Sequence, residues 1–334
     1  MELEMKPPAP PPSWGDLWAN TIKGDPRNLA RILAHAGGST QRGRYRHWHK
    51  LRYLDPPPEL TREEWWLGIK LARKAQAKEI PLLDSGGQPF SYTMPMIAHE
   101  LLHDIDRRAS GSIAAPEQVT NPQTRDRYVI SSLMEEAITS SQLEGAATTR
   151  RVAKEMLRTG RLPRDRNEQM IFNNYRAMQE IRQLRADSLS LEVLIHLQET
   201  VTFNTINPRD IGQLRSPEDS VVVADQDGTL LHDPPDAREL PDRILRLCAF
   251  ANSSDETTGF VHPVVRAILL HFWLAYDHPF VDGNGRTARA LFYWSMAKHD
   301  YWLCEFISIS RILRSAPSKY ARAFLYTETD ENDL

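Results

Sequence analysis

The stretch His278-Pro-Phe-Val-Asp-Gly-Asn-Gly-Arg-Thr-Ala-Arg289 places a titratable base, a carboxylate, a glycine-rich turn and two arginines close together in the chain. Gly283 and Gly285 flank Asn284, and residues without a β-carbon let successive backbone N–H groups turn toward one point, which forms a concave nest for anions. A helical pattern begins directly after this turn. The N-terminal amides and the positive end of the helix dipole are therefore expected to face the same anion. The stretch predicts a phosphate-binding site.

The charged side chains of this stretch fit phosphate chemistry. Arg286 and Arg289 are three residues apart, so both guanidinium groups leave one face of the helix and can hold a polyphosphate. Asp282 suits Mg²⁺, which commonly takes one or two carboxylates together with substrate phosphates. His278, with an ordinary pKa of about 6.5, is the general base here that can accept a proton from a hydroxyl at neutral pH. Phe280 is expected to anchor the loop in the core.

The stretch resembles the signature of the Fic family, His-x-Phe-x-Asp/Glu-Gly-Asn-Gly-Arg-x-x-Arg, and every defined position is present in order. Most Fic enzymes move AMP from ATP to a hydroxyl group of a target protein, so the resemblance implies a protein adenylyltransferase that uses ATP and Mg²⁺. It implies that His278 is the base and that Asp282 holds the metal. The residues expected to bind ATP through its phosphates are Gly283, Asn284, Gly285, Arg286 and Arg289, the last of them at the γ-phosphate.

A second segment, Ser140-Ser-Gln-Leu-Glu144-Gly145, ends a long helical pattern upstream of the signature. Ser140 and Glu144 are four residues apart, so one helix face presents a hydroxyl and a carboxylate together. Gly145 suits a helix C-cap. The segment resembles the inhibitory motif of one class of Fic proteins, Ser/Thr-x-x-x-Glu-Gly/Asn. The resemblance implies that Glu144 pairs with Arg289, denies it to the γ-phosphate of ATP and so inhibits the enzyme.

Residues 220–233 predict a β-hairpin, because two aliphatic or β-branched runs are joined by turn residues at 225–228. In the Fic family a flap of this kind, preceded as here by Arg215, lies over the active site and receives the target segment by strand addition. The resemblance implies that the target docks on Val221, Val222 and Val223. A passive surface hairpin is the alternative.

The segment His99-Glu-Leu-Leu-His103 matches His-Glu-x-x-His, which on a helix places two imidazoles on one face for zinc, with Glu100 as the base. A zinc hydrolase needs a third protein ligand, and Asp106 is the candidate closest in sequence. A match this short also arises by chance in chains of this histidine content. We therefore favour a helix with two surface or capped histidines, and keep the zinc hydrolase as the weaker alternative.

Charge and composition limit the partners of the chain. With 41 Lys+Arg against 44 Asp+Glu, the net charge of −3 gives no overall field that favours nucleic acid or an anionic membrane. The mixture of basic and aromatic residues at 42–53 has two interpretations. The aliphatic parts of Arg and Lys can lie over aromatic rings within the domain, or the segment can bind nucleic acid, and we favour the first. Two cysteines, no secretory signal pattern and no apolar run of bilayer length predict a cytoplasmic protein.

The predicted fold is all-α, a Fic-type helical domain with one β-hairpin flap plus a helical N-terminal region. The N-terminal region covers 1–124 and starts with a proline-rich tail. The Fic domain covers 125–334, with the inhibitory helix at about 128–145, the flap at about 220–233 and the catalytic loop at 278–289. The partner expected is a target protein, self-modification is expected, and a homodimer is compatible with this interpretation. Two alternatives remain: another Fic reaction, such as AMP removal or transfer of another nucleotide, and a binding-only Fic-like adaptor.

Overall fold

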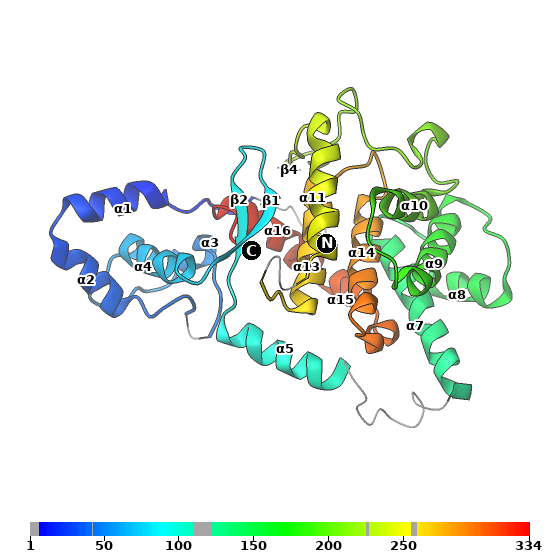
Figure 1. The fold of residues 1–334 in the computed structure, drawn as a ribbon, viewed down its shortest axis with the longest axis horizontal. Helices are drawn as coiled ribbons and strands as arrows, with labels where there is room; N and C mark the ends of the chain where they lie inside the picture. The colour runs from blue at the N-terminus through cyan, green and yellow to red at the C-terminus, as the bar shows by residue number, and fades with distance from the viewer. Residues whose placement is uncertain (1–6, 42, 110–121, 225–226, 255–258) are drawn as a thin grey trace. The chain divides into compact units, whose positions relative to one another are not determined.

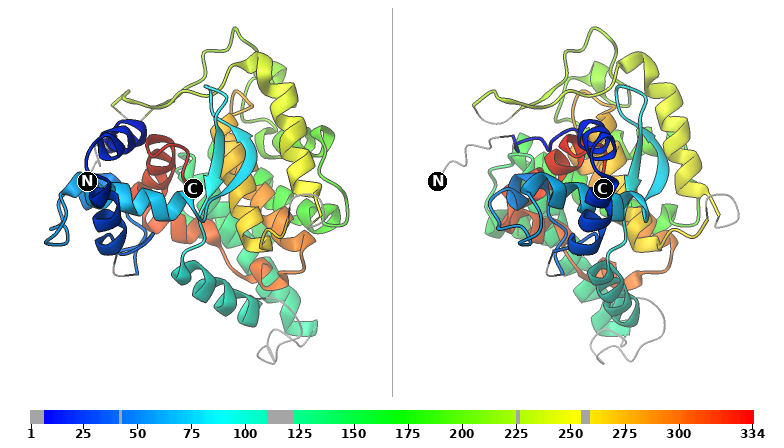
Figure 2. Two further views of the ribbon diagram at one scale, coloured as in Figure 1. Left: turned by 60° about the vertical axis from the view of Figure 1, so that its left-hand side comes forward. Right: turned by 90° about the vertical axis from the view of Figure 1, so that its left-hand side faces the viewer.

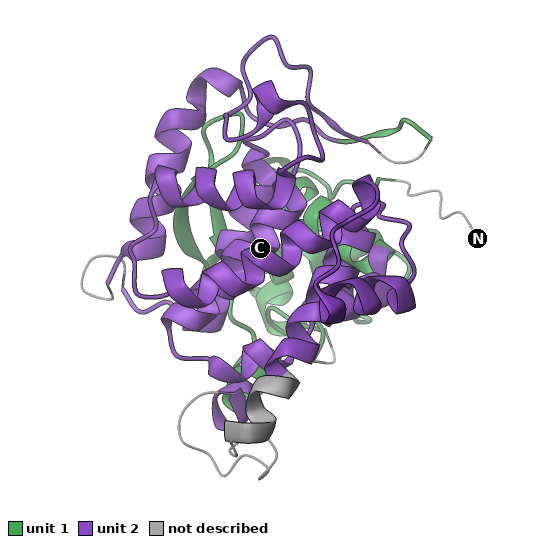
Figure 3. Cartoon of the chain, turned by 90° about the vertical axis from the view of Figure 1, so that its right-hand side faces the viewer, with its two compact units in different colours: residues 1–103, 225–231, 318–334 green, residues 104–224, 232–317 purple. Residues whose placement is uncertain are grey.

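The structure, a computed structural model, describes residues 7–41, 43–109, 122–224, 227–254 and 259–334 (Figure 1). The chain forms two compact units (Figure 3). Unit 1 comprises residues 1–103, 225–231 and 318–334, and unit 2 comprises residues 104–224 and 232–317. Helices dominate both units, which confirms the mostly helical fold.

Unit 2 is a layered bundle of helices around the pair α13 and α14. Its helices are α7 (Pro122–Leu143), α8 (Arg150–Thr159), α9 (Arg166–Leu184), α10 (Leu191–Thr202), α11 (Leu240–Asn252), α13 (Pro263–Asp277), α14 (Asn284–Lys298) and α15 (Ile309–Ser315), with short 3-10 turns η1 (Pro208–Asp210), η2 (Ala237–Glu239) and η3 (Trp302–Phe306). Helix α14 packs against α13, α7, α9 and α10, and α11 packs against α13 (Figure 1). The pair α13 and α14 is therefore central in this unit.

The sequence explains why α13 and α14 are central. Helix α13 begins at Pro263, with the His262 ring accepting a hydrogen bond from the Val264 N–H as an N-cap. Most of its residues are buried, as expected for a helix that is apolar around its whole circumference.

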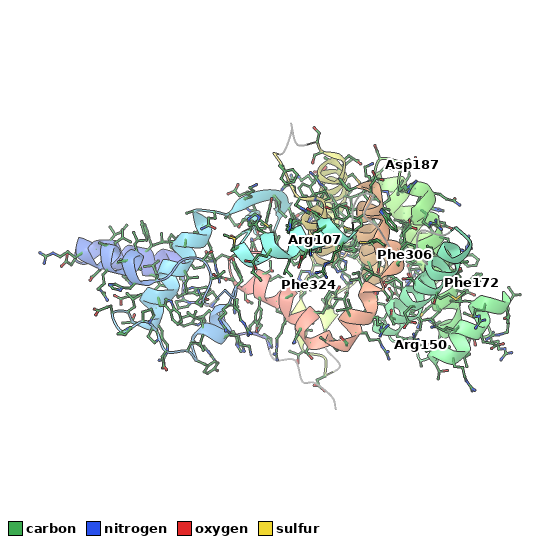
Figure 4. All side chains as sticks on the ribbon, turned by 90° about the horizontal axis from the view of Figure 1, so that it is seen from below. Arg107, Arg150, Phe172, Asp187, Phe306 and Phe324 are labelled. Atoms are coloured by element: carbon green, nitrogen blue, oxygen red, sulfur yellow. The ribbon has the colours of Figure 1, made fainter. Side chains whose placement is uncertain are left out.

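Helix α8 packs against α7. The guanidinium of Arg150 on α8 (labelled in Figure 4) donates to the Glu135 carboxylate on α7 at 2.6 and 2.9 Å.

Unit 1 contains α1 (Trp14–Lys23), α2 (Pro26–His35), α3 (Trp48–Leu51), α4 (Arg62–Lys74), β1 (Lys78–Leu83) and β2 (Pro89–Tyr92); α5 (Met96–Ala109) begins and α16 (Pro317–Thr329) ends in it. Helices α1, α2 and α4 pack together (Figure 2) around Ile32, Trp66 and Ile69. Helix α4 starts with a capping box in which the side chains of Thr61 and Glu64 each accept from the backbone N–H of the other residue.

Strands β1 and β2 form an antiparallel hairpin that the sequence analysis misses, since it expects one hairpin, at residues 220–233, and a helical N-terminal region. The Asp84 carboxylate accepts from the N–H groups of Gly86 and Gln88 and shapes the turn of the hairpin. Ile80 pairs with Phe90 across the ladder, and both are buried. The alternation of buried and exposed side chains is the signal of a strand, but Pro81 inside the run weakens it.

The predicted flap is present but short. Strands β3 (Val223–Ala224) and β4 (Leu230–His232) form the second two-stranded sheet. Val221 and Val222 precede β3 instead of belonging to it, and residues 225–226 of the predicted turn lie outside the described part of the chain. A ribbon of two strands is marginal by itself, so little of this segment is held as regular sheet.

A buried charge cluster joins the C-terminal residues 330–334 to the rest of unit 1. Lys70 Nζ lies 2.9 Å from Asp330 Oδ1, and Arg73 lies 3.5 Å from Asp330 and 3.6 Å from Asp333. Ser91 of β2 donates to the Asn332 carbonyl and accepts from the Leu334 N–H. These contacts explain why 318–334 groups with the N-terminal unit and not with the segment that the sequence analysis assigns to the Fic domain.

We expect Arg73→Ala to destabilise unit 1 strongly. The Arg73 side chain is 1% exposed, and its loss leaves two buried carboxylates short of a partner, which typically costs about 3–5 kcal/mol. Thermal and urea unfolding followed by circular dichroism would measure the change. Arg27→Ala, at a side chain that is 93% exposed, is the matched control and should change stability by less than about 0.5 kcal/mol. Equal effects of the two variants would contradict the cluster's role.

Candidate active site

The loop between α13 and α14 is held in one shape by its own residues. His278 ends α13 in the left-handed region at φ 46°, and its N–H donates to the Leu274 carbonyl at 3.0 Å. Phe280 is completely buried, as predicted for the anchor. The Asn284 amide accepts from the Phe280 N–H at 3.0 Å and donates to the Phe280 carbonyl at 2.7 Å. Asn284 therefore acts inside the loop, as a brace between its two ends.

His278 is held in the tautomer that a general base requires. Its Nδ1 lies 3.2 Å from the Ala275 carbonyl oxygen, which can only accept, so Nδ1 carries the proton and Nε2 keeps a lone pair. The pKa of His278 falls to about 4, chiefly because burial disfavours the imidazolium; the Ala275 carbonyl and Glu144 oppose this shift, and His232 adds to it. The imidazole is neutral at pH 7 and can take a proton at Nε2.

The two glycines at the start of α14 stand where a side chain would collide with a neighbour. Gly283 has φ 88°, and a β-carbon on it would lie 2.6 Å from Thr202 Cγ2. A β-carbon on Gly285 would overlap the Glu144 carboxylate. Among the described residues no side chain caps the start of α14, as a site for an anion requires. The Glu144 carboxylate lies against this helix start.

The two arginines of the predicted phosphate site differ in their surroundings. Arg286 is 1% exposed; its guanidinium donates to the Val201 carbonyl and to Asp282 Oδ1, while its Nε has no hydrogen-bond partner among the described residues. Arg289 donates from Nε to the Ser140 hydroxyl at 2.8 Å and from NH2 to the Ser140 carbonyl at 3.1 Å. The Nε–H of Arg286 is therefore a buried donor that a bound anion would satisfy.

Glu144 forms an ion pair with Arg289, at 2.8 Å between Oε1 and NH2. Burial raises the pKa of Glu144, but Arg289 and then Arg286 outweigh it, so that the pKa lies below its ordinary value and the carboxylate is ionised. Helix α7 ends just before Glu144 in a Schellman motif, with Gly145 at φ 88° and the Ala146 N–H donating to the Ser141 carbonyl at 3.0 Å. The helix end thus delivers Glu144 directly to Arg289.

Asp282 lies at the edge of the nest and fits a metal site in which the substrate and water supply the other ligands. Its side chain is 39% exposed, with Oδ2 3.6 Å from Arg166 and Oδ1 3.3 Å from Arg286. Among the described residues, no group of three or more histidine, cysteine, aspartate or glutamate side chains is placed to hold a metal. A single carboxylate beside an anion cradle is the donor set expected for Mg²⁺ that takes its other ligands from phosphates and water.

The zinc alternative lacks its third ligand in the described part of the chain. His99 and His103 are exposed on α5, which agrees with the surface histidines that the sequence analysis favours. Asp106, the proposed third ligand, instead accepts a hydrogen bond from the Tyr301 hydroxyl and lies 3.0 Å from His262 Nε2. Asp106 is therefore engaged with other side chains.

Two side chains attach the ends of the flap segment to the last turn of α13. Arg215 donates from Nε to the His278 carbonyl at 2.9 Å, and its own N–H donates to the Pro279 carbonyl at 2.9 Å. Nε2 of His232 lies 2.7 Å from the Tyr276 carbonyl. The sequence analysis names Arg215 only through the family resemblance and gives His232 no role, because a contact to a distant helix end has no local pattern.

Asp277, next to the candidate base, is a buried acid that the sequence analysis misses. It is completely buried, accepts from Arg243 Nε at 2.7 Å and accepts from Trp273 Nε1 at 2.9 Å. Burial raises the pKa of Asp277 to about 6, against the opposing effect of Arg243. An aspartate inside an otherwise apolar helix is the signal that could have found it.

Comparison with known proteins shows what part of this chain is similar to. Residues 188–296 match the sequence profile of the Fic/DOC family. The chain is 33% identical over 107 residues to protein adenylyltransferase Fic of Nematostella vectensis, which is 32% of this chain and 22% of that protein. It is 45% identical over 60 residues to protein adenylyltransferase Fic of Drosophila melanogaster, which is 18% of this chain and 12% of that protein. The matches therefore span a minor part of both relatives.

A solved structure of a Fic family protein from Desulfovibrio desulfuricans G20 superposes with a TM-score of 0.53 at 19% identity, over 70% of this chain and 66% of that chain. At this identity the likeness concerns the fold, which is a mostly helical Fic-like fold with small two-stranded sheets. Within residues 188–296 the chain is similar to the Fic/DOC family, and part of it shows distant similarity to protein adenylyltransferases. None of the described helices is long and apolar enough to cross a membrane.

We expect His278 to titrate far below an ordinary histidine. Nitrogen-15 NMR of the imidazole should show the Nδ1–H tautomer unchanged from pH 8 down to pH 5, with protonation only near pH 4. The pKa of His278 is lowered because burial disfavours the charged imidazolium. His278 therefore stays neutral as the pH falls through about 6.5, the ordinary pKa of histidine. Titration of His278 near pH 6.5, or an Nε2–H tautomer at pH 7, would contradict the geometry.

Proposed function

We propose that this chain is a protein adenylyltransferase, which moves AMP from ATP to a tyrosine, serine or threonine hydroxyl of a target protein and is restrained by Glu144. The observation that carries the proposal is the neutral His278, with Nε2 free to accept a proton, in the same short loop as an anion nest and two buried arginines. A base and a phosphate cradle held by one loop are what transfer of a nucleotidyl group to a hydroxyl needs.

In the proposed reaction, His278 Nε2 takes the proton of the target hydroxyl as its oxygen attacks the α-phosphorus of ATP. The new bond joins that oxygen to phosphorus, the bond between the α- and β-phosphates breaks, and pyrophosphate leaves with the electron pair. The first-turn amides of α14 and Arg286 stabilise the developing negative charge, and Arg289 holds the γ-phosphate. Mg²⁺ held by Asp282 would offset the charge of the departing pyrophosphate.

Glu144 restrains this reaction by competing for the γ-phosphate ligand. Its carboxylate lies on Arg289 and against the place where a β-carbon of Gly285 would be, so it takes both the cation and part of the nest. ATP bound without Arg289 would leave its α-phosphate out of line with the hydroxyl. Because the Glu144 side chain is 32% exposed, solvent screening limits the contact to about 1–2 kcal/mol.

The flap is the proposed docking place of the target. Arg215 and His232 fix both of its ends beside His278, so an extended segment paired with the backbone around Val221, Val222 and Val223 would carry its hydroxyl to the base. Main-chain pairing also explains how one site accepts different sequences. The target protein is the expected partner, and self-modification is expected when no target is present.

We expect His278→Ala to abolish transfer while nucleotide binding stays within about twofold of the wild type, because the imidazole acts on the hydroxyl and not on the phosphates. Incubation with labelled ATP, UTP, GTP and CTP and Mg²⁺ measures transfer and nucleotide choice, and calorimetry measures binding. His103→Ala is the control. It removes a histidine that the zinc alternative requires, and it should transfer at the wild-type rate. Wild-type labelling by His278→Ala would refute the role of this base.

Glu144→Gly should raise transfer by roughly five- to thirtyfold, the factor that about 1–2 kcal/mol corresponds to. The variant frees Arg289 for the γ-phosphate, whereas Arg289→Ala breaks the same pair but also deletes the phosphate ligand and should stay slow. The double variant should therefore resemble Arg289→Ala. Initial rates of labelling at fixed ATP measure all three. A rate for Glu144→Gly equal to the wild type would show that α7 is only scaffold.

A further inference from the structure

One polar stripe of α7 faces one polar stripe of α14. Glu136, Ser140 and Glu144 are spaced four residues apart, so they lie on one face of the helix. Their partners on α14 have the same spacing in reverse order: Tyr293 bonds Glu136, Arg289 bonds Ser140 and Glu144, and Gly285 lies against Glu144. The two helices therefore meet in an antiparallel polar ladder of three rungs.

The Glu136 rung is the most heavily bonded of the three. The Glu136 side chain accepts from the Tyr293 hydroxyl at 2.9 Å, from the Ser308 hydroxyl at 2.9 Å and from the Ser310 N–H at 3.0 Å, and it also bonds the Ser310 hydroxyl. Glu136 is 2% exposed, and within the described residues no lysine, arginine or histidine forms an ion pair with it. It is satisfied entirely by neutral donors from two other elements.

Tyr293 has a protonated hydroxyl that lies between two acceptors, Glu136 at 2.9 Å and the Ile307 carbonyl at 3.0 Å. Burial and then Glu136 raise the pKa of Tyr293 well above its ordinary value, so the hydroxyl keeps its proton. The same oxygen accepts from the Ile309 N–H at 2.8 Å, which fixes the start of α15 beside the rung. Ser308 is the N-cap of α15 and accepts from the Arg311 N–H. The rung thus joins α7, α14 and the first turn of α15.

This arrangement fixes the register of α7. A slip by one helical turn would move Glu144 by about 5.4 Å, well beyond the reach of Arg289. Such a slip would also strip Glu136 of its donors in a dry site, where a carboxylate without partners is costly. The rung at Glu136 is deep, whereas the rung at Glu144 is 32% exposed. The deep rung is therefore the one that sets where the exposed rung lies.

We propose that Glu136 is a positioning residue: its bonds to Tyr293, Ser308 and Ser310 hold α7 in the register that places Glu144 on Arg289. The start of α15 is then the point from which the inhibitory contact can be released, since any change that draws residues 308–310 away loosens α7. The inference rests on the proposed function where it concerns transfer, but the register itself is independent of the reaction.

The register is tested by hydrogen exchange of the full chain, read by mass spectrometry over peptides of residues 137–143. Tyr293→Phe removes one donor and keeps the ring, and Glu136→Gln keeps the size and replaces an acceptor by a donor. Both should speed exchange over 137–143 by at least fivefold, with no change in α9. Tyr301→Phe is the control, because it removes a part-buried tyrosine–carboxylate bond, to Asp106, outside the ladder.

Transfer rates in two backgrounds separate positioning from general destabilisation. In the wild-type background, Tyr293→Phe and Glu136→Gln should raise transfer by at least threefold, because Glu144 is held less firmly. In the Glu144→Gly background they should raise it by less than 1.5-fold, since the contact that they position is already gone. A merely structural role would instead lower the rate in both backgrounds.

The outcomes distinguish this inference from the proposed function. Unchanged exchange over 137–143 in both ladder variants overturns the register role, whatever Glu144→Gly does. An equal gain in transfer in both backgrounds overturns it as well. If exchange quickens as expected but Glu144→Gly transfers no faster than the wild type, the register role stands and the proposed inhibition fails.

Discussion

Two helix ends of opposite polarity meet in one short loop, and the site depends on how each end is satisfied. The last turn of α13 leaves carbonyl groups that need donors, and the first turn of α14 leaves N–H groups that need acceptors. Arg215 and His232 supply donors to the carbonyls of His278 and Tyr276. In the described part of the chain no side chain caps the start of α14, and the Glu144 carboxylate lies against it. The end of α13 is thus completed by neighbouring side chains, whereas the start of α14 has no cap of its own.

Burial gives the rest of the site its precision. Asp277, one residue before the candidate base, forms an ion pair with Arg243 that has almost no exposed surface, and Trp273 adds a second hydrogen bond to Asp277. Asn284 spans the loop through both backbone groups of Phe280. Because breaking a buried pair is costly, these contacts confine His278 to one position. Rigid support of this kind keeps a general base within reach of its substrate.

The sequence predicted the parts of the site that are local in the chain. Spacing alone placed two glycines, a carboxylate and two arginines around one helix start, and the structure shows that start uncapped and bordered by them. The meeting of Glu144 with Arg289 also follows the prediction, although only a resemblance suggested it. The prediction of a mostly helical fold also holds for unit 2, where most residues of α13 are buried.

What the sequence did not predict comes from contacts between distant segments. The docking of His232 on α13, the donors around Glu136 and the clustering of Asp330 with Lys70 join residues that no local pattern links. The hairpin β1–β2 was not predicted because Pro81 weakens the strand signal given by the alternation of buried and exposed side chains in β1. Asn284 differs from the expectation in another way: its amide is used within the loop, a role that depends on a turn shape that composition does not reveal.

The overlap between Glu144 and the missing β-carbon of Gly285 has a further consequence. The anion that lies against the nest is covalently attached to the protein, so its local concentration is set by the length and stiffness of α7 and not by the surrounding solution. Dilution of the protein cannot remove it, and high salt reaches it only through its exposed edge. Any anion from solution would therefore have to compete with the tethered Glu144 carboxylate, and the position of the end of α7 sets the balance between the two.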